Sequence, residues 1–231
     1  MTTTSFQTDP GIDTQLLLRV DGSLPPSARA GADLNALCDR AEDTTTPAAV
    51  LLHVTGAPEL PFPPRTDMQA VSRWERAVRR LERLNTPTVA VAEGDCGGLA
   101  LDVLLATDLR LATADVRLVM TDHNGVGWPG MALYRLVQQV GAGRARRCVL
   151  FGAAVPADEA VELGIVDTFV PDVRSGIRRG HQAAVGRDGS ELAVRRRLLH
   201  EASTVAFEDA LGRHLAACDR LLRRTPPKDT P

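Results

Sequence analysis

A glycine-rich turn between a strand-like run and an apolar segment is the part of the chain best suited to chemistry. Residues 88–92 follow a proline and are rich in β-branched side chains, which predicts a strand, and the turn at 93–98 has three glycines in five positions. Residues 99–106 are apolar and predict a buried helix that begins beside Gly97 and Gly98. Its first-turn N–H groups would point into a bend without Cβ atoms, at the positive end of the helix. This pattern predicts an oxyanion hole, and the alternative is a tight turn that needs glycine only for its conformation.

Two aspartates stand where carboxylates could transfer protons. Asp102 lies within the apolar helix, where a charge needs a partner or a function because an unpaired buried charge is costly. Asp122 follows a predicted strand end and precedes His123 and another glycine-rich turn. Two acids that face one site would have separated pKa values, leaving one as acid and one as base. The alternatives are a buried salt bridge to an arginine for Asp102 and a loop cap for Asp122.

His123 titrates near neutral pH and adjoins Asp122, so it could orient that carboxylate or act itself. The alternative is an ordinary histidine in a surface loop. The five histidines are scattered without a pair at i+3 or i+4, and the four cysteines form no C-x-x-C pair. We therefore predict no metal site.

The elements that would position these residues alternate between strand and helix, which predicts an α/β fold with a largely parallel sheet. Val71, Trp74, Val78 and Leu81 recur at helical spacing and predict an amphipathic helix with Trp74 on its core face. The remaining predicted strands are at 16–20, 48–54, 108–112 and 116–120. The remaining predicted helices are at 27–41 (capped by Ser27), 143–151, 158–163, 173–180, 191–202 and 206–224.

Composition narrows the class of protein. The chain has 231 residues, 44% of them hydrophobic, and a formal net charge of −2, so it can bury one substantial core. Charges of both signs are interspersed, which predicts neither a nucleic-acid nor a membrane partner. We recognise neither a signal peptide nor an apolar run near 18 residues, and we expect a cytoplasmic protein with reduced cysteines.

Three spaced motifs carry a resemblance to a known family. These are TPTVAVAEGDCGGLALDVLLATDLRLAT at 86–113, VRLVMTDHNGVGWPG at 116–130 and FGAAVPADEAVELGIVD at 151–167. Together they resemble the enoyl-CoA hydratase/isomerase (crotonase) superfamily. The resemblance implies a crotonase-like ββα spiral core with C-terminal helices and an acyl-CoA substrate. It implies no separate cofactor, because coenzyme A is part of the substrate thioester.

The resemblance also assigns roles to individual residues. The family's oxyanion-binding amide falls on Leu99, with Gly98 just before it. Its two catalytic glutamates fall on Asp102 and Asp122, which are each one methylene shorter. The resemblance thus implies that the two aspartates share proton transfer at the carbon next to a thioester carbonyl.

Two further positions follow from the family pattern. Its second oxyanion amide comes from an A-G-x-D motif that residues 55–64 lack, and the prolines there have no N–H to donate. This leaves Ala57 or Leu60 as the source of a substitute amide. Trp128 lies in the family's P-G turn, where it either lines an acyl pocket or contributes only to packing.

Two arginine clusters, at 144–147 and 195–197, are candidates for binding coenzyme A phosphates or an acidic partner. The alternative for both is a solvated helix face.

A narrower resemblance comes from WERAVRRLERL at 74–84, the Gly-Asp-Cys-Gly-Gly turn and STVAFEDALGRHLAACDRLLRR at 203–224. These are similar to the small crotonase-like helper proteins of 3,5-dihydroxyphenylglycine biosynthesis. That group implies dehydration and aromatisation of a polyketide-CoA thioester to 3,5-dihydroxyphenylacetyl-CoA beside a type III polyketide synthase, in glycopeptide antibiotic biosynthesis. The alternatives are a non-catalytic partner of that synthase and a conventional enoyl-CoA hydratase/isomerase.

We expect four regions: a flexible segment at 1–13, the spiral core at 14–170, a helical region at 171–224 and a disordered tail at 225–231. The family resemblance implies a homo-oligomer, often a trimer. The apolar stripe within 206–224 could serve that association or an internal core.

Overall fold

A parallel sheet covered by helices forms the body of the molecule. The computed structural model describes residues 16–45, 48–59, 66–120, 122–123, 126–128 and 130–224, with side chains omitted at 122, 123, 126 and 127. The predicted flexible segment at 1–13 and tail at 225–231 lie outside these residues. The mixed α/β architecture confirms the fold class predicted from the sequence.

The sheet runs in the order β1-β2-β3-β4-β9, and all four of these neighbouring pairs are parallel. The short β5 pairs in parallel with β3 and antiparallel with β8, while β6 and β7 form a separate antiparallel pair. The strands are β1 (Leu17–Asp21), β2 (Val50–Gly56), β3 (Thr88–Cys96), β4 (Leu109–Ala112), β5 (Arg117–Leu118), β6 (Asp122–His123), β7 (Val126–Gly127), β8 (Val155–Pro156) and β9 (Thr168–Phe169).

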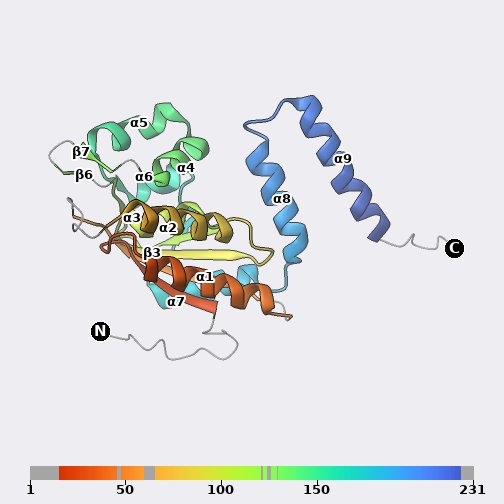
Figure 1. Cartoon of the computed structure of the whole chain (residues 1–231), viewed down its shortest axis with the longest axis horizontal. Helices are drawn as coiled ribbons and strands as arrows, with labels where there is room; N and C mark the ends of the chain where they lie inside the picture. Colours follow the sequence, from red (N-terminus) through yellow and green to blue (C-terminus); the bar gives the residue numbers. More distant parts are fainter. Residues whose placement is uncertain are drawn as a thin grey trace.

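Helices cover both faces of this sheet (Figure 1). On one face the alternate residues Val50, Leu52 and Val54 of β2 belong to the main core. On the other face Leu51 joins a second cluster with α7. The helices are α1 (Ala28–Asp43), α2 (Met68–Leu81), α3 (Gly98–Leu105), α4 (Met131–Val140), α5 (Ala142–Phe151), α6 (Ala157–Glu162), α7 (Val173–Ala184), α8 (Gly189–Glu201) and α9 (Phe207–Arg224).

Helix starts follow the polar caps. Ser27 accepts a hydrogen bond from the Ala30 amide at 3.1 Å, which confirms the predicted cap of α1. Asp67 caps α2 in the same way, through the Ala70 amide at 2.7 Å. These caps fix the starts of two adjacent helices, and α2 carries Trp74 into the core as its spacing predicts.

Several boundaries differ from the sequence-based expectation. Strand β3 continues to Cys96, so most of the predicted turn at 93–98 is strand. The strand predicted at 116–120 is reduced to two residues in β5. Helix α4 has no counterpart among the predicted elements, although α3 packs directly against it.

Helices α8 and α9 lie to one side of the sheet (Figure 1). Arg196 of α8 is 7% exposed and contacts Asp108 through two hydrogen bonds of 2.5 and 2.6 Å. It also donates to the Leu84 carbonyl at 2.5 Å. One buried side chain thus ties α8 to the loops before β3 and β4.

Candidate active site

Three loops meet at the carboxyl ends of β1, β2 and β3. The Gly22 amide donates to Thr55 O at 2.7 Å, and the Gly97 amide donates to Gly56 O at 2.9 Å. A Cβ on Gly22 would collide with the carbonyl oxygens of both Gly97 and Gly56. Glycine is therefore required there for close backbone approach, at the edge of a parallel sheet where ligands commonly bind.

The turn into α3 leaves two backbone donors available. Gly98 has a φ of +48°, in the left-handed region that favours glycine. The Ala100 and Leu101 amides both donate to Gly97 O, at 3.0 and 3.3 Å. Among the described residues, neither the Gly98 nor the Leu99 amide finds an acceptor. These are the two amides that the family resemblance assigns to an oxyanion hole.

The Leu99 side chain does not obstruct this turn. It is 3% exposed and belongs to the main core, whereas Gly98 lines the adjacent hollow. Pro58 packs against the turn, because its ring would lie 2.9 Å from a Cβ on Gly98. Ala57 packs beside Gly97 and carries a backbone N–H, while Leu60 lies outside the described residues.

A small hollow lies between the start of α3, the residues after β5 and the start of α4. Its cavity volume of about 10 Å³ is close to what one water molecule requires. It brings Gly98 together with Asp102 and Trp128, which the sequence had singled out separately. Among the described residues, those that line it are Gly98, Leu101, Asp102, Val119, Met120, Trp128, Gly130 and Ala132.

Asp102 is the buried acid of this hollow. It is 6% exposed, and its Oδ2 accepts a hydrogen bond from the Trp74 Nε1–H at 2.9 Å. Its Oδ1 lies 3.6 Å from Arg135 Nη1 and makes no hydrogen bond to a described residue. The salt-bridge alternative for Asp102 is therefore confirmed in part. Arg135 lies within ion-pair distance of the carboxylate but beyond hydrogen-bond distance.

Burial changes the chemistry of this carboxyl. Desolvation, followed by the nearby charge of Glu75, raises the pKa of Asp102 to about 7. The Trp74 hydrogen bond, the Arg135 charge and the Ala132 amide oppose that rise in pKa. At neutral pH the carboxyl is divided between its acid and base forms, which suits proton transfer.

Arg135 is held in place by two other carboxylates. Its Nε contacts Glu82 Oε1 at 2.6 Å, and its Nη1 contacts Glu75 Oε2 at 3.1 Å. The guanidinium is 7% exposed, so these pairs lie largely out of solvent. The sequence reasoning missed Arg135, Glu75 and Glu82 as site residues, and it read Trp74 only as core. The signal that could have found a partner was the need of a buried Asp102 for a donor.

Asp122 and His123 form β6, opposite Gly127 and Val126 of β7. This pair of strands lies in the chain between Met120 and Trp128, which both line the hollow. The side chains of Asp122 and His123 lie outside the described part of the structure, so their proposed roles remain predictions.

Members of both arginine clusters form ion pairs within the fold. Arg147 pairs with Glu159 at 2.5 Å, and Arg196 is buried against Asp108. Arg196 thus fits neither a phosphate site nor a solvated face. In the part of the chain that the structure describes, no three His, Cys, Asp or Glu side chains are grouped to hold a metal ion. No helix within the described ranges is long and apolar enough to cross a bilayer.

The parallel spiral of strands and helices, with a glycine turn leading into a helix that bears a buried acid, defines a protein of the crotonase class. A sequence model described as enoyl-CoA hydratase/isomerase matches residues 64–229. The chain belongs to the enoyl-CoA hydratase/isomerase family, whose members act on acyl-CoA thioesters.

Individual relatives agree with this assignment. A protein from Amycolatopsis orientalis named "Enoyl-CoA-hydratase" is 48% identical over 210 residues, covering 91% of this chain and 97% of its own length. An enoyl-CoA hydratase/isomerase structure from Marinobacter aquaeolei has a TM-score of 0.74 at 18% identity, covering 91% of this chain and 88% of that one. A family protein from Silicibacter pomeroyi has a TM-score of 0.76 at 17% identity, covering 93% and 97%. The two structures support the fold alone.

Proposed function

We propose that this protein is an acyl-CoA enzyme in which Asp102 transfers a proton next to a thioester carbonyl held by the Gly98 and Leu99 amides. The observation that carries the proposal is a buried carboxyl with a pKa of about 7 in the same hollow as the glycine turn. The amides and the positive end of α3 would stabilise the negative charge that develops on the thioester oxygen.

The proposed chemistry is a dehydration through an enolate. A base removes a proton from the carbon next to the carbonyl, and the electron pair moves onto the thioester oxygen. When the enolate collapses, the hydroxyl on the β-carbon takes a proton from the second acid and leaves as water. We assign these two roles to Asp102 and Asp122, with His123 orienting Asp122.

The hollow must widen to admit an acyl group. Its volume of about 10 Å³ accommodates a water molecule but not an acyl chain. Trp128 and Met120 are among the residues that line it, so we propose that substrate entry displaces these two side chains. Trp128 would then border the acyl group.

For the substrate, we propose a polyketide-CoA thioester that is dehydrated and aromatised towards 3,5-dihydroxyphenylacetyl-CoA with the help of a type III polyketide synthase. The support is the resemblance of residues 74–84 and 203–224 to the helper proteins of dihydroxyphenylglycine biosynthesis. A conventional enoyl-CoA hydratase/isomerase fits the family equally well. We place this activity in the cytoplasm, where the buried thiols of Cys38, Cys96 and Cys148 would stay reduced.

Two assays separate these substrates. In the first, the protein is incubated with crotonyl-CoA alone and hydration is followed by loss of the enoyl absorbance. In the second, it is added to malonyl-CoA and a type III polyketide synthase, and aromatic CoA thioesters are identified by mass spectrometry. We expect the protein to increase the yield of aromatic CoA thioester in the second assay. If the protein acts only on crotonyl-CoA, the proposed polyketide substrate is wrong and the protein is a conventional enoyl-CoA hydratase.

The same assays separate an enzyme from a non-catalytic partner. Asp102→Asn and Asp122→Asn should each lower product formation by roughly 10²-fold or more, because each removes a proton-transfer group. Variants that remain folded and stimulate the synthase as well as the unmodified protein does would overturn the catalytic proposal in favour of a non-catalytic partner.

A further inference from the structure

The two oxygens of Asp102 have different surroundings. Oδ2 accepts the Trp74 indole N–H at 2.9 Å, whereas Oδ1 has no hydrogen-bond partner among the described residues. The indole nitrogen can only donate, so it always favours Oδ2 as an acceptor without a proton. Because Oδ2 is the acceptor of this bond, a proton on the carboxyl is carried by Oδ1, which protein atoms enclose.

Trp74 is itself fixed in position. It is 2% exposed, lies in the middle of α2 and belongs to the main core. A large ring packed on all sides has little freedom to turn, so its N–H points steadily at α3. The Asp102 carboxyl, on a helix of eight residues, is thus oriented from the neighbouring α2.

The charges that face Asp102 come from α2 and α4. Glu75 of α2 raises the pKa of Asp102, while Arg135 and the Ala132 amide of α4 lower it. Arg135 also pairs with Glu75 and Glu82, at 3.1 and 2.6 Å, so its charge is shared among three carboxylates. Because Arg135 stays 3.6 Å from Oδ1, it can moderate the charge of Asp102 without occupying that oxygen.

We propose that Trp74 is the positioning residue of this site: its indole N–H holds Oδ2 of Asp102 and so leaves the carboxyl's proton to Oδ1, while Arg135, clamped by Glu75 and Glu82, balances the charge. The catalytic part of this inference rests on the proposed role of Asp102. The hydrogen bond and its response to pH do not depend on that role and can be measured without substrate.

The direct test is the indole N–H resonance of Trp74 in ¹⁵N-labelled protein. The chain has two tryptophans, so Trp74→Phe assigns both signals. We expect the Trp74 signal to shift with a midpoint near the Asp102 pKa of about 7. Asp102→Asn should abolish this transition, which excludes other titrating groups as its source. A Trp74 signal that does not move between about pH 5 and pH 9, or moves equally in Asp102→Asn, would overturn the proposal.

Activity provides the second readout. Trp74→Phe keeps most of the ring volume but removes the donor, so kcat should fall roughly 10²-fold while KM changes little. The midpoint of its pH–rate profile should rise, because a hydrogen bond that favours ionised Asp102 is lost. The matched variant Glu75→Gln should lower that midpoint, because it removes a neighbouring negative charge.

These outcomes separate the two proposals. If Asp102→Asn remains fully active, the proposed function fails, whatever the indole resonance shows. If Asp102→Asn is inactive but folded Trp74→Phe keeps the unmodified rate and pH profile, only the positioning role fails. The Trp128 indole signal, compared with its position in the unmodified protein, reports whether Trp74→Phe is folded.

Discussion

The Asp102 side chain is buried, although its ionised form carries a charge. It lies among leucines and valines of α3, and the nearest cation is 3.6 Å from its free oxygen. A carboxyl in such surroundings holds its proton to a higher pH than one in water. The raised pKa allows Asp102 to act as both acid and base near neutral pH. The same burial destabilises the folded state when the carboxyl is ionised.

That cost predicts a specific pH dependence. The pKa of Asp102 is raised to about 7 in the folded chain, so the folded state keeps a proton that the unfolded state has already lost. Folding stability from this group is therefore present at low pH and is lost as pH rises through about 7. Relative to Asp102→Asn, the unmodified protein should lose unfolding free energy between about pH 4 and pH 7, the interval between the ordinary and the raised pKa of Asp102. Urea unfolding of both proteins at several pH values measures this difference.

The control for this measurement is Asp33→Asn, because the Asp33 side chain is 56% exposed and pairs with Arg29 on the same helix. Its difference from the unmodified protein should stay nearly constant over the same pH range. A constant difference for Asp102→Asn as well would show that Asp102 titrates as an ordinary surface acid.

Part of the site was predictable at the level of single residues. The apolar neighbours of Asp102 indicated a buried acid that needs a partner, and the structure supplies Trp74 and Arg135. Helical periodicity predicts only a core role for Trp74, because it detects the apolar ring and ignores the indole N–H. Arg135 could not be paired with Asp102 from the sequence, because nothing local links positions 33 residues apart.

At the level of elements, close backbone contact among Gly22, Gly56 and Gly97 forms a glycine junction. This junction lets the carboxyl ends of β1, β2 and β3 approach one another. Gly22→Ala should lower the free energy of unfolding by about 1–3 kcal/mol or more, since its Cβ would collide with backbone carbonyls that cannot rotate away. Gly143→Ala is the matched control: a Cβ there meets nothing, and α5 should gain up to about 1 kcal/mol. Thermal unfolding compares the two. Equal melting temperatures would show that the junction tolerates a side chain.

Arg196 holds α8 to the loops before β3 and β4 through Leu84 and Asp108. Arg196→Met keeps an apolar stem but leaves Asp108, 19% exposed, without its cation. We expect a loss of about 3–5 kcal/mol in the free energy of unfolding, as for a broken buried ion pair.

Arg195→Met on the exposed side of α8 serves as the control and should change stability by less than about 0.5 kcal/mol. Denaturant unfolding measures both variants. If the two are equally stable, Arg196 does not hold α8 to the sheet.

Elements were predictable where they are long and periodic. The strand at 88–92 and the helix at 71–81 follow from side-chain pattern alone. Helix α4 was missed because its cap, Gly130, has no side chain to mark a start and follows a turn-like Trp128-Pro129 sequence. Strands β5, β8 and β9 have two residues each, and they exist through pairing partners that local sequence does not encode.

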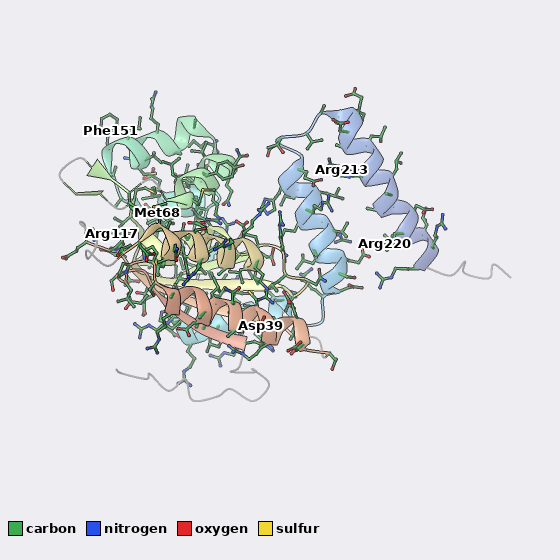
Figure 2. The ribbon with its side chains drawn as sticks, viewed as in Figure 1. Asp39, Met68, Arg117, Phe151, Arg213 and Arg220 are labelled. Carbon is green, nitrogen blue, oxygen red and sulfur yellow. The ribbon has the colours of Figure 1, made fainter. Side chains whose placement is uncertain are left out.

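At the level of the whole molecule, α9 presents an apolar stripe that the described part of the chain leaves exposed. None of its side chains is buried, and Phe207, Leu211, Leu215 and Leu222 are 73%, 44%, 59% and 74% exposed. On the other side of the helix, Arg213 pairs with Glu201 at 2.6 Å and Arg220 with Glu191 at 3.3 Å. Figure 2 marks these two arginines on the side of α9 towards α8.

We therefore expect copies of the chain to associate through α9, because contiguous exposed apolar surface commonly marks a protein–protein interface. The double variant Leu211→Glu/Leu215→Glu should shift the mass measured by light scattering to that of one chain, 24.8 kDa. Ala216→Glu, which is exposed but lies off the stripe, should keep the mass of the unmodified protein. An unmodified protein of 24.8 kDa, or an assembly unaffected by the double variant, would contradict this expectation.

The central claim is that Asp102 moves a proton at the carbon next to a thioester carbonyl. Its most direct measurement is deuterium exchange at that carbon in D₂O, followed by NMR with butyryl-CoA and 3,5-dihydroxyphenylacetyl-CoA as probes. We predict exchange into at least one probe with the unmodified protein, and a loss of roughly 10²-fold or more in folded Asp102→Asn. Absence of exchange with the unmodified protein, or an unchanged rate in Asp102→Asn, would contradict the account.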